Sequence, residues 1–490
     1  MQKLLILLVA ACACVSAAAV TVECSPGQLQ SLVASPATET SLTVTGQLDA
    51  SDLIFISEHM PALATLDIAG ATIVEYQGFQ LNGHRHYAGN EIPAAVFAGS
   101  AISTLVLPDT PLTLGDAAFA GSGLQAVVLP RQLSLGCGVF AGCKQLKTAE
   151  IAVSKLSEAT FSDCIGLESV TISAACDIGA GAFANCTGLS AVSGSANVKE
   201  IGPKAFAGCT GLKTFEFGSG LEAIGDEAFA QSGIEKADLS HCTALRTVGE
   251  WTFARCAALT DAALPGQLAG YSSGLFFDCT ALTQLTAIPG ATAIGDYAFK
   301  GSRSLPAGGL LAEGIEELGA YSLAANNSTS VELPSSLSYI GDNAMEGMTQ
   351  LQEIYGQKLQ AVPGLGSEVW TGIDQAAVSL FVDASRTEDF DAADQWCEFH
   401  ILAYDSSTPE ITLTPAPVKG RFAGKELQLD FGSCQASLVE LYNVSGTLLV
   451  QARPAQSGTL SIDTSDFADN IYLVAVTLTD GTRTALKLAR

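Results

Sequence analysis

The cysteines of this sequence are the side chains whose type and spacing could carry chemistry. Six of them recur at one position of a repeated unit: Cys143, Cys164, Cys186, Cys209, Cys256 and Cys279. Thiolates form disulfides, bind zinc and act as nucleophiles. No C-x-x-C pair and no histidine at a regular offset accompanies them, which argues against zinc. An even number of cysteines in an exported chain would favour disulfides. Their regular period instead favours a buried column of free thiols that act as small apolar side chains.

Acid–base chemistry has few candidates. Glu316-Glu317 could in principle serve a glycosidase, but this pair directly precedes the repeated corner Leu318-Gly319. The run His84-Arg85-His86 invites a metal, yet no Cys, Asp or Glu cluster lies at ligand spacing, so we expect a solvated loop. The chain has five histidines and no G-x-S-x-G, H-E-x-x-H, Walker or Rossmann motif. We therefore expect no enzyme activity, no cofactor and no metal.

Repeats are the elements that must position these residues. A phenylalanine marks each repeat at intervals of 21 to 24 residues, and Leu323 and Met345 then take its position. A sustained period of this length is typical of a solenoid. The sequence predicts an α/β solenoid of about 12 repeats with a ladder of parallel strands. The phenylalanines are Phe97, Phe119, Phe140, Phe161, Phe183, Phe206, Phe229, Phe253, Phe276 and Phe299.

Each repeat has the same internal order. An aliphatic residue and a glycine open it, as in Ile201-Gly202, where glycine permits a tight corner or a positive φ. An Ala-Phe pair follows on an expected short helical turn, with the ring pointing inward. The cysteine comes three residues later, and Leu-x-x-Φ-x-Φ closes the unit as a strand. The phenylalanines and the cysteine column are therefore expected to form the structural core.

These units resemble leucine-rich repeats of the BspA-like bacterial surface proteins, whose pattern runs I-G-x-x-A-F-x-G-C-x-x-L. The resemblance covers residues 92–356. It extends to SLTVTGQLDASDL at residues 41–53, which is similar to the family's N-terminal cap. Residues 380–402 are similar to its C-terminal cap, in which an extended segment leads to a helix carrying Trp396 and Phe399. The resemblance implies a capped solenoid at the cell surface, whose partners would be host matrix proteins or other microbes.

The strand ladder offers the candidate binding surface. In such a solenoid the strands line a concave face, and the residue between the last two inward positions of each strand points to solvent. This position is small, hydroxylic or acidic, and it suits an extracellular protein or glycan better than a buried small substrate. A simple solvated sheet face is the alternative. The candidate contacts are Val128, Glu150, Thr171, Ser193, Glu216, Asp238, Thr286, Glu332 and Tyr355, with Val106 and Ala263 in the same position.

The ends of the chain indicate export. Residues 1–19 have one Lys, an apolar run and small residues, as in a secretory signal peptide. Residues 9–12 also resemble a lipoprotein box that would acylate Cys12. No other window is apolar enough for a membrane-spanning helix. We expect an N-terminal cap at 20–90, repeats at 91–356, a C-terminal cap at 357–403, a linker at 404–416 and a β-sandwich at 417–490.

The last of these segments alternates apolar and polar residues in short strands, which predicts a small antiparallel sandwich. Its motifs, LYNVSG, NIYLVAV and GTRTALKL, resemble the C-terminal sorting domain of type IX secretion cargo in Bacteroidota. That resemblance implies passage across the outer membrane, removal of the domain and joining to surface lipopolysaccharide. Asn470 stands where the family usually has a glycine. A generic terminal β domain is the alternative.

The composition narrows the partners. The net charge is −27, which argues against nucleic acid because phosphate binding needs a basic face. We expect a non-enzymatic adhesin of a Gram-negative bacterium, exported and anchored through its sorting domain and monomeric before attachment. The type IX secretion machinery would be a further partner. A glycan-capturing or glycan-processing surface protein and a passive envelope protein are the alternatives.

Overall fold

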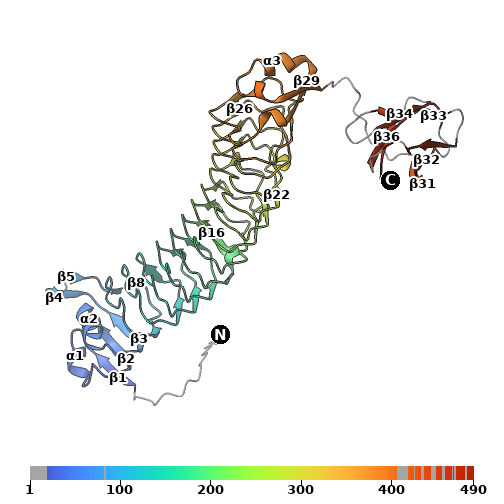
Figure 1. Ribbon diagram of the computed structural model, residues 1–490. Coiled ribbons are helices and arrows are strands. Elements are labelled where there is room, and N and C mark those ends of the chain that lie inside the picture. Colours follow the sequence, from blue (N-terminus) through green and yellow to red (C-terminus); the bar gives the residue numbers. More distant parts are fainter. Residues whose placement is uncertain are drawn as a thin grey trace. The chain divides into compact units, whose positions relative to one another are not determined.

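The computed structural model describes residues 19–81, 84–404, 418–423, 425–431, 435–442, 448–454, 458–465, 467, 471–479 and 483–489. The chain divides into two compact units, Met1–Tyr404 and Asp405–Arg490. Figure 1 shows the first unit as a stack of thin layers and the second as a small group of strands. Residues 1–18 of the predicted signal peptide and 405–416 of the predicted linker lie outside the described residues, whereas Tyr404 belongs to a strand.

The first unit contains the predicted ladder of parallel strands, here called the first ladder. Its strands form separate hydrogen-bonded sheets, and within each sheet neighbouring strands pair in register, so Val128, Glu150, Thr171 and Ser193 lie side by side. Its strands are β1 (Val20–Cys24), β2 (Ser41–Leu48), β3 (Thr65–Ile73), β7 (Thr104–Val106), β9 (Ala126–Leu129), β11 (Thr148–Ile151), β13 (Ser169–Ile172), β15 (Ala191–Ser193), β18 (Lys236–Asp238), β20 (Asp261–Ala263), β22 (Gln284–Thr286), β25 (Ser330–Glu332), β27 (Glu353–Tyr355), β29 (Ser379–Asp383) and β30 (His400–Tyr404).

A second ladder, which the sequence did not reveal, is built from the aliphatic residues that open each repeat. Its strands are two to four residues long, too short for an alternating pattern to show. They also pair in parallel, as Ala223↔Thr247 and Ile224↔Val248 do. The strands are β6 (Glu91–Ile92), β8 (Leu112–Leu114), β10 (Leu133–Leu135), β12 (Lys155–Leu156), β14 (Cys176–Ile178), β16 (Val198–Ile201), β17 (Ala223–Ile224), β19 (Thr247–Val248), β21 (Gly270–Tyr271), β23 (Ala293–Ile294), β24 (Glu317–Leu318), β26 (Tyr339–Ile340) and β28 (Gly364–Leu365).

The core between the two ladders is a column of stacked rings. Every phenylalanine of the series from Phe97 to Phe299 has no exposed surface. Successive rings lie 5.2–5.9 Å apart between centroids, at interplanar angles of 8–23°. Leu323 and Met345 continue the buried column. Trp370 then takes the same position, 25 residues after Met345 and between Glu368 and Gly372, which both have positive φ. The layers thus extend past residue 356.

The turn that carries each phenylalanine differs from the expected helical turn. Alternate N–H groups of this segment donate to the next layer: Lys204 N to Asp226 O (2.8 Å), Phe206 N to Ala228 O (2.7 Å) and Gly208 N to Ala230 O (2.9 Å). A helix would need those groups for bonds within the segment. Lys204 and Gly208 have positive φ of 57° and 72°, which turns alternate peptide groups toward the neighbouring layer. The turn is therefore a third line of hydrogen bonds between layers.

The glycine that opens each repeat was expected to permit a tight corner or a positive φ, but the structure gives it another role. Gly202, Gly225 and Gly249 are not among the residues with positive φ. A Cβ atom on Gly202 would lie 2.8 Å from the Ala180 nitrogen of the preceding layer, and one on Gly249 would lie 2.5 Å from the Asp226 nitrogen. Close approach of consecutive layers explains these glycines.

Residues 20–90, for which the sequence predicts an N-terminal cap, contribute β1, β2 and β3 to the first ladder. The Asp49 side chain caps α2 (Ala50–His59) in a capping box with Asp52. A short helix, α1 (Leu29–Leu32), also lies in this region. The run at His84 was expected to be a loop, but it forms β5 (His84–Tyr87), which pairs with β4 (Tyr76–Leu81). There His86 Nε2 lies 2.8 Å from Glu75 Oε1.

The C-terminal cap also differs in detail. Its helix is α3 (Thr387–Asp391), whereas Trp396 begins the short 3-10 turn η5 (Trp396–Glu398). Trp396 and Phe399 are buried, and the indole N–H donates to Pro363 O at 3.1 Å. The helix ends early because the chain must turn into β30, which pairs with β29. Four other 3-10 turns occur: η1 (Ser195–Asn197), η2 (Ala307–Gly309), η3 (Gln375–Ala377) and η4 (Ala384–Arg386).

The second unit has antiparallel sheets in the orders β31-β32-β35 and β34-β33-β36-β37, with their own apolar core. This agrees with the predicted sandwich, although β31 and β35 were not foreseen. Asn470 and the expected turn at 443–446 lie outside the described residues. The strands are β31 (Lys419–Ala423), β32 (Glu426–Asp430), β33 (Ala436–Tyr442), β34 (Leu448–Ala452), β35 (Thr459–Asp463), β36 (Ile471–Leu478) and β37 (Arg483–Ala489).

The bend of the first unit places the two ladders on opposite sides. In Figure 1, β8, β16 and β26 of the second ladder lie along the inner side of the bend, and β22 and β29 of the first ladder lie along its outer side. The first ladder was expected to line a concave surface, but it lies on the outer, convex side of the bend (Figure 1). That expectation assumes a single ladder whose strands approach more closely than the loops opposite. A solenoid with hydrogen-bonded ladders on both sides does not meet this condition.

Candidate binding surface

Most strands of the first ladder expose two residues to solvent, such as Thr148 and Glu150 on β11, and the predicted contacts are the second of each pair. Nearly all of them are exposed, with Val128 at 62%, while Tyr355 and Ala263 are half-buried. Their inward neighbours, such as Ala149 and Val170, are buried. The alternation follows from the two-residue period of a strand. The result is a narrow face whose polar residues repeat once per layer.

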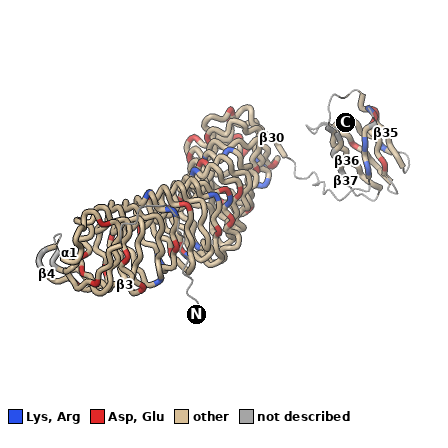
Figure 2. Tube along the Cα trace, turned by 90° about the horizontal axis from the view of Figure 1, so that it is seen from below, with Lys and Arg blue, Asp and Glu red and all other residues tan. Residues whose placement is uncertain are grey.

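Ion pairs neutralise part of the charge on this face. Lys147 Nζ lies 2.7 Å from Glu168 Oε1, and Lys358 Nζ lies 2.7 Å from the candidate Glu332. Exposed pairs of this kind contribute little to stability. Glu150 and Glu216 take part in no described ion pair. Figure 2 shows acidic and basic residues spread along the repeats.

The first ladder is interrupted at Glu216, where a continuing strand was expected. The backbone of Glu216 bonds instead to the Ser195 hydroxyl, which accepts from its N–H (3.1 Å) and donates to its carbonyl (2.9 Å). The rings of Phe215 and Phe217 pack edge-on against Phe229, at 5.2 and 5.5 Å. Two large inward rings on one strand need more room than a regular layer gives, so the strand is displaced.

A hollow of about 420 Å³ accompanies this interruption, with Glu216 and Asp238 in its lining. His241 also lines it, and its Nε2 atom lies 2.6 Å from the carbonyl oxygen of Phe217. Hydrogen bonds from Ser240 lower the pKa of Asp238, so this carboxylate keeps its charge. Two predicted contacts thus meet at one depression, whose lining also includes the apolar side chains of Phe215 and Phe217.

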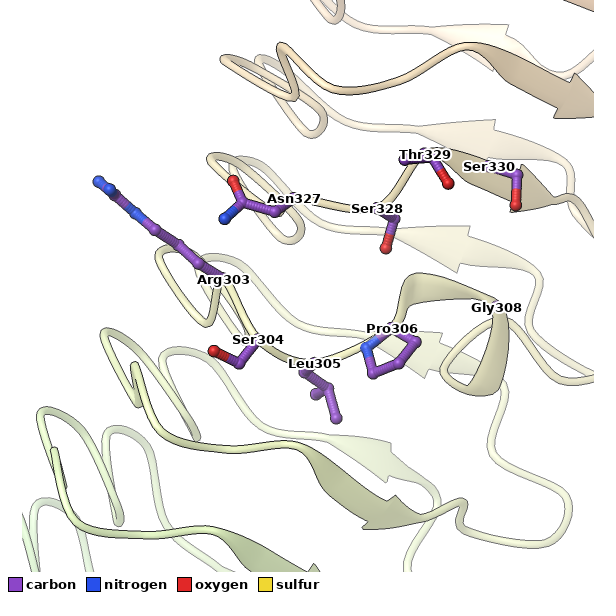
Figure 3. Close-up of a pocket in the computed structure, with 9 residues that line it drawn as sticks. All are labelled: Arg303, Ser304, Leu305, Pro306, Gly308, Asn327, Ser328, Thr329 and Ser330. Atoms are coloured by element: carbon purple, nitrogen blue, oxygen red, sulfur yellow. The ribbon is translucent and has the colours of Figure 1, made fainter.

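Another interruption lies between β22 and β25, where η2 replaces a strand, and β7 and β9 are not paired either. Figure 3 shows the hollow that results, with Ser328, Thr329 and Ser330 on one layer and Leu305 and Pro306 on the other. Its volume is about 340 Å³. The Ser328 hydroxyl accepts from Ala307 N at 2.8 Å, which ties the two layers together. This depression was not predicted, because Pro306-Ala307-Gly308 departs from the repeat pattern.

The Tyr355 ring ends the predicted row. It stacks on Phe381 with centroids 5.0 Å apart and planes at 11°. Its hydroxyl donates to Glu353 Oε2 at 2.7 Å, and this hydrogen bond raises the pKa of Tyr355 to about 12. The ring therefore stays neutral at physiological pH.

The cysteine column is structural. Each thiol donates to the carbonyl of the phenylalanine one layer back, as Cys209 Sγ does to Phe183 O at 3.1 Å and Cys256 Sγ to Phe229 O at 3.1 Å. All described cysteines are free. Burial raises the pKa of Cys209 to about 12, so the thiol stays protonated and unreactive. Ser122 and Ser232 occupy the same position in other layers and lie 3.4 Å from the next cysteine.

Among the described residues, no three His, Cys, Asp or Glu side chains are grouped so that they could hold an ion. Glu316 and Glu317 are both exposed beside the second ladder. No helix among the described residues is long and apolar enough to cross a membrane.

Sequence reasoning missed a row of aromatic side chains on the turns. Trp251, Tyr297 and Tyr321 each stand two residues after the glycine that opens a repeat, and all three have positive φ. Aligning the repeats on that glycine, rather than on the strand, would have revealed them. Their rings contact one another across layers, as described below.

The comparisons agree with this architecture. The description "BspA type Leucine rich repeat region" matches residues 90–192, 176–306 and 291–363, in six copies. Together these ranges cover more than half of the 490 residues. The chain belongs to the BspA type leucine-rich repeat family. No curated protein matches this family member.

Solved structures similar to this BspA type protein are also repeat proteins. A leucine-rich repeat protein from Bacteroides ovatus ATCC 8483 is 18% identical, with a TM-score of 0.50 over 75% of this chain and 86% of that chain. The pneumococcal vaccine antigen PcpA is 13% identical, with a TM-score of 0.37 over 74% and 80%. A leucine rich cell surface protein from Faecalibacterium prausnitzii A2-165 is 21% identical, with a TM-score of 0.25 over 50% and 63%. The first of these supports the solenoid fold.

Proposed function

We propose that this protein is a non-enzymatic interaction protein of the bacterial cell surface, and that the first ladder contacts an extracellular protein. The observation that carries the proposal is the in-register row of exposed residues within each sheet of the first ladder, such as Asp238, Ala263 and Thr286 on β18, β20 and β22. A repeat solenoid that exposes such a row is suited to an extended partner surface.

The size of the face fits this role. Twelve layers at a strand spacing of about 4.8 Å extend for about 60 Å. A standard protein interface buries about 800 Å² on each side. A strip one strand wide and of this length can supply that area without a pocket. The acidic residues of the face, with Glu150 and Glu216 in no described ion pair, favour a partner with a basic or neutral surface.

The ends of the chain supply the route to the surface. Residues 1–19 would direct export from the cytoplasm, and residues 417–490 would act as a type IX sorting domain that leads to attachment at the outer membrane. By resemblance to the BspA-like proteins, we expect matrix proteins of a host, or other microbes, as partners. We propose no chemical step after binding.

Binding assays test the proposal. The full chain is immobilised and presented with a panel of extracellular matrix proteins and with cells of other microbes. A partner that uses the first ladder binds the wild type but loses affinity for a triple variant, Glu150→Lys, Glu216→Lys and Asp238→Lys. The matched control places lysines at Glu200 and Glu317 of the second ladder and at Glu222, which directly precedes β17. No binding across both panels, or equal binding by both triple variants, would contradict the proposal.

A further inference from the structure

A row of half-buried aromatic rings crosses the turns of successive layers, away from the strands of the first ladder. Trp251, Phe277, Tyr297 and Tyr321 form this aromatic row. The Trp251 ring lies 5.2 Å from Phe277 and 5.8 Å from Tyr297 between centroids. Tyr297 and Tyr321 stack at 4.9 Å with planes 13° apart. Large aromatic side chains at consecutive surface positions are unusual, because most surface apolar residues stand alone.

Backbone glycine supports the tryptophan. A Cβ atom on Gly274 would lie 2.2 Å from Cδ2 and 2.3 Å from Cε3 of Trp251, so the indole rests directly on this glycine. Gly274 interrupts the row for one layer, and this gap lets Trp251 reach across to Tyr297. The covered part of the ring faces the backbone of Gly274. The side chain is half-buried, so part of the indole stays accessible.

Hydrogen bonds between layers hold the row rigid. Trp251 N donates to Ser273 O at 2.8 Å, Gly274 N to Asp296 O at 2.7 Å, and Tyr297 N to Ala320 O at 2.8 Å. These bonds fix the backbone beneath each ring before any ligand arrives. A surface ordered in advance loses little conformational freedom on binding.

Polar groups border the rings on both sides. Glu250 and Asp296 immediately precede Trp251 and Tyr297 in their turns and are exposed. On the other side, the Arg255 guanidinium carbon lies 5.3 Å from the Phe277 ring centre. Lys300 Nζ lies 4.1 Å from the Tyr321 ring centre and 3.7 Å from Glu346 Oε2. The row is thus a narrow apolar strip between hydrogen-bonding groups.

We propose that the aromatic row is a binding site for a neutral glycan, with a sugar ring stacked on the indole of Trp251. One face of a pyranose ring presents C–H groups, which pack on the electron-rich face of an aromatic ring. The hydroxyls around the sugar ring then meet the carboxylate and guanidinium groups beside the row. This activity is separate from the protein contact proposed for the first ladder.

The charges select this ligand over others. A net charge of −27 opposes nucleic acids and polyanionic glycans. A protein partner would have to bury the carboxylates and cations that flank a strip only one ring wide, and burying charges without good partners is costly. Sugar hydroxyls can bond to those groups while the flanks stay in contact with water.

Tryptophan fluorescence of the full chain gives a direct test. The chain has three tryptophans, and Trp370 and Trp396 are 2% and 1% exposed, so a ligand at the surface changes the emission of Trp251 alone. The probes are neutral oligosaccharides of glucose, mannose, galactose and xylose, with calorimetry as a second measurement. We expect at least one probe to shift the emission and to bind.

Two variants separate the site from the fold. Trp251→Glu introduces the residue that Glu227 already provides at the same position of its own turn, with a φ of 54°. It should fold and bind the probe at least tenfold more weakly. Trp251→Phe should retain most of the affinity. Tyr355→Ala, on the first ladder, is the control and should bind the probe as the wild type does.

The outcomes are distinct. Failure of every neutral probe to bind, or equal affinity of Trp251→Glu and the wild type, would overturn the glycan site. Binding of a protein that Trp251→Glu abolishes, without any glycan binding, would also overturn it in favour of a protein contact on the turns. None of these results bears on the first ladder, whose test uses other variants.

Discussion

Phe206 shows how one residue serves the whole stack. Its ring lies 5.2 Å from Phe183 on one side and 5.2 Å from Phe229 on the other, and Phe215 meets it edge-on. A ring in this position is a contact for the layers before and after it. Its loss therefore affects three layers, whereas the loss of a ring in an ordinary core affects one site.

The first prediction follows from that geometry. Phe206→Ala leaves a cavity that rigid neighbouring layers cannot fill, so the free energy of unfolding should fall by about 3–5 kcal/mol. Urea unfolding followed by circular dichroism measures the change. Val128→Ala, at a position 62% exposed, is the control and should change stability by less than about 0.5 kcal/mol. A small loss for Phe206→Ala would mean that the layers collapse around the cavity.

The small residue three positions after each phenylalanine of the column adds a second structural contact. Cysteine, serine and asparagine alternate at this position, and Ser302 and Asn326 also bond to carbonyl groups of the preceding layer. At most of these positions a compact side chain donates one hydrogen bond, whereas the buried Ser100 hydroxyl has no partner among the described residues and Met348 takes the position in a later layer. Chemical reactivity is not required, and a thiol kept protonated by burial satisfies the need.

At the scale of the element, consecutive turns depend on each other through paired residues. The Asp226 carboxylate accepts from Glu250 N, one layer on, at 2.9 Å. The same bond joins Asp116 to Cys137, Asp296 to Ala320 and Asp342 to Ser367. In each case, the residue whose N–H donates to the aspartate follows a glycine. A Cβ atom on that glycine would lie within 2.5 Å of the aspartate oxygen. Aspartate in one repeat thus requires glycine in the next.

Gly249→Ala tests this dependence. The added methyl meets both the nitrogen and the carboxylate of Asp226 at 2.5 Å, so the layers must separate and the free energy of unfolding should fall by about 1–3 kcal/mol. Gly220→Ala is the matched control, because nothing lies within 4 Å of its Cβ position. Thermal unfolding of both variants gives the comparison. Equal stability of the two would show that close packing does not explain the opening glycine.

The repeat period of the sequence was enough to predict the features that recur once per layer. The recurring phenylalanine located the core, and the alternation around Val128 and Glu150 located the exposed strand positions. The sequence was not enough where a strand is too short for an alternating pattern to show, as in the second ladder. It was also not enough where large side chains displace a strand, as at Phe215 and Phe217. The aromatic row was missed because Trp251, Gly274 and Tyr297 form a site only when their layers are stacked.

At the scale of the whole molecule, acidity and repetition act together. The chain has 23 basic and 50 acidic residues. Ion pairs such as Lys213 with Glu235, at 3.5 Å, join neighbouring layers. A long stack of similar faces would be prone to associate with its own kind, and a high net charge opposes this. The second unit has a separate apolar core, which suits a domain whose role differs from that of the repeats.

Removing that unit tests the proposed route to the surface. A chain that ends at residue 416 keeps the predicted signal peptide and every described layer of the first unit, so it should fold, leave the cytoplasm and remain in the periplasm. Protease treatment of intact cells, followed by fractionation, measures its location. As the converse control, residues 405–490 fused to an exported soluble reporter should carry that reporter to the surface, because they contain their own core. Surface display of the truncated chain, or acylation of Cys12, would show that the chain is anchored by its other end.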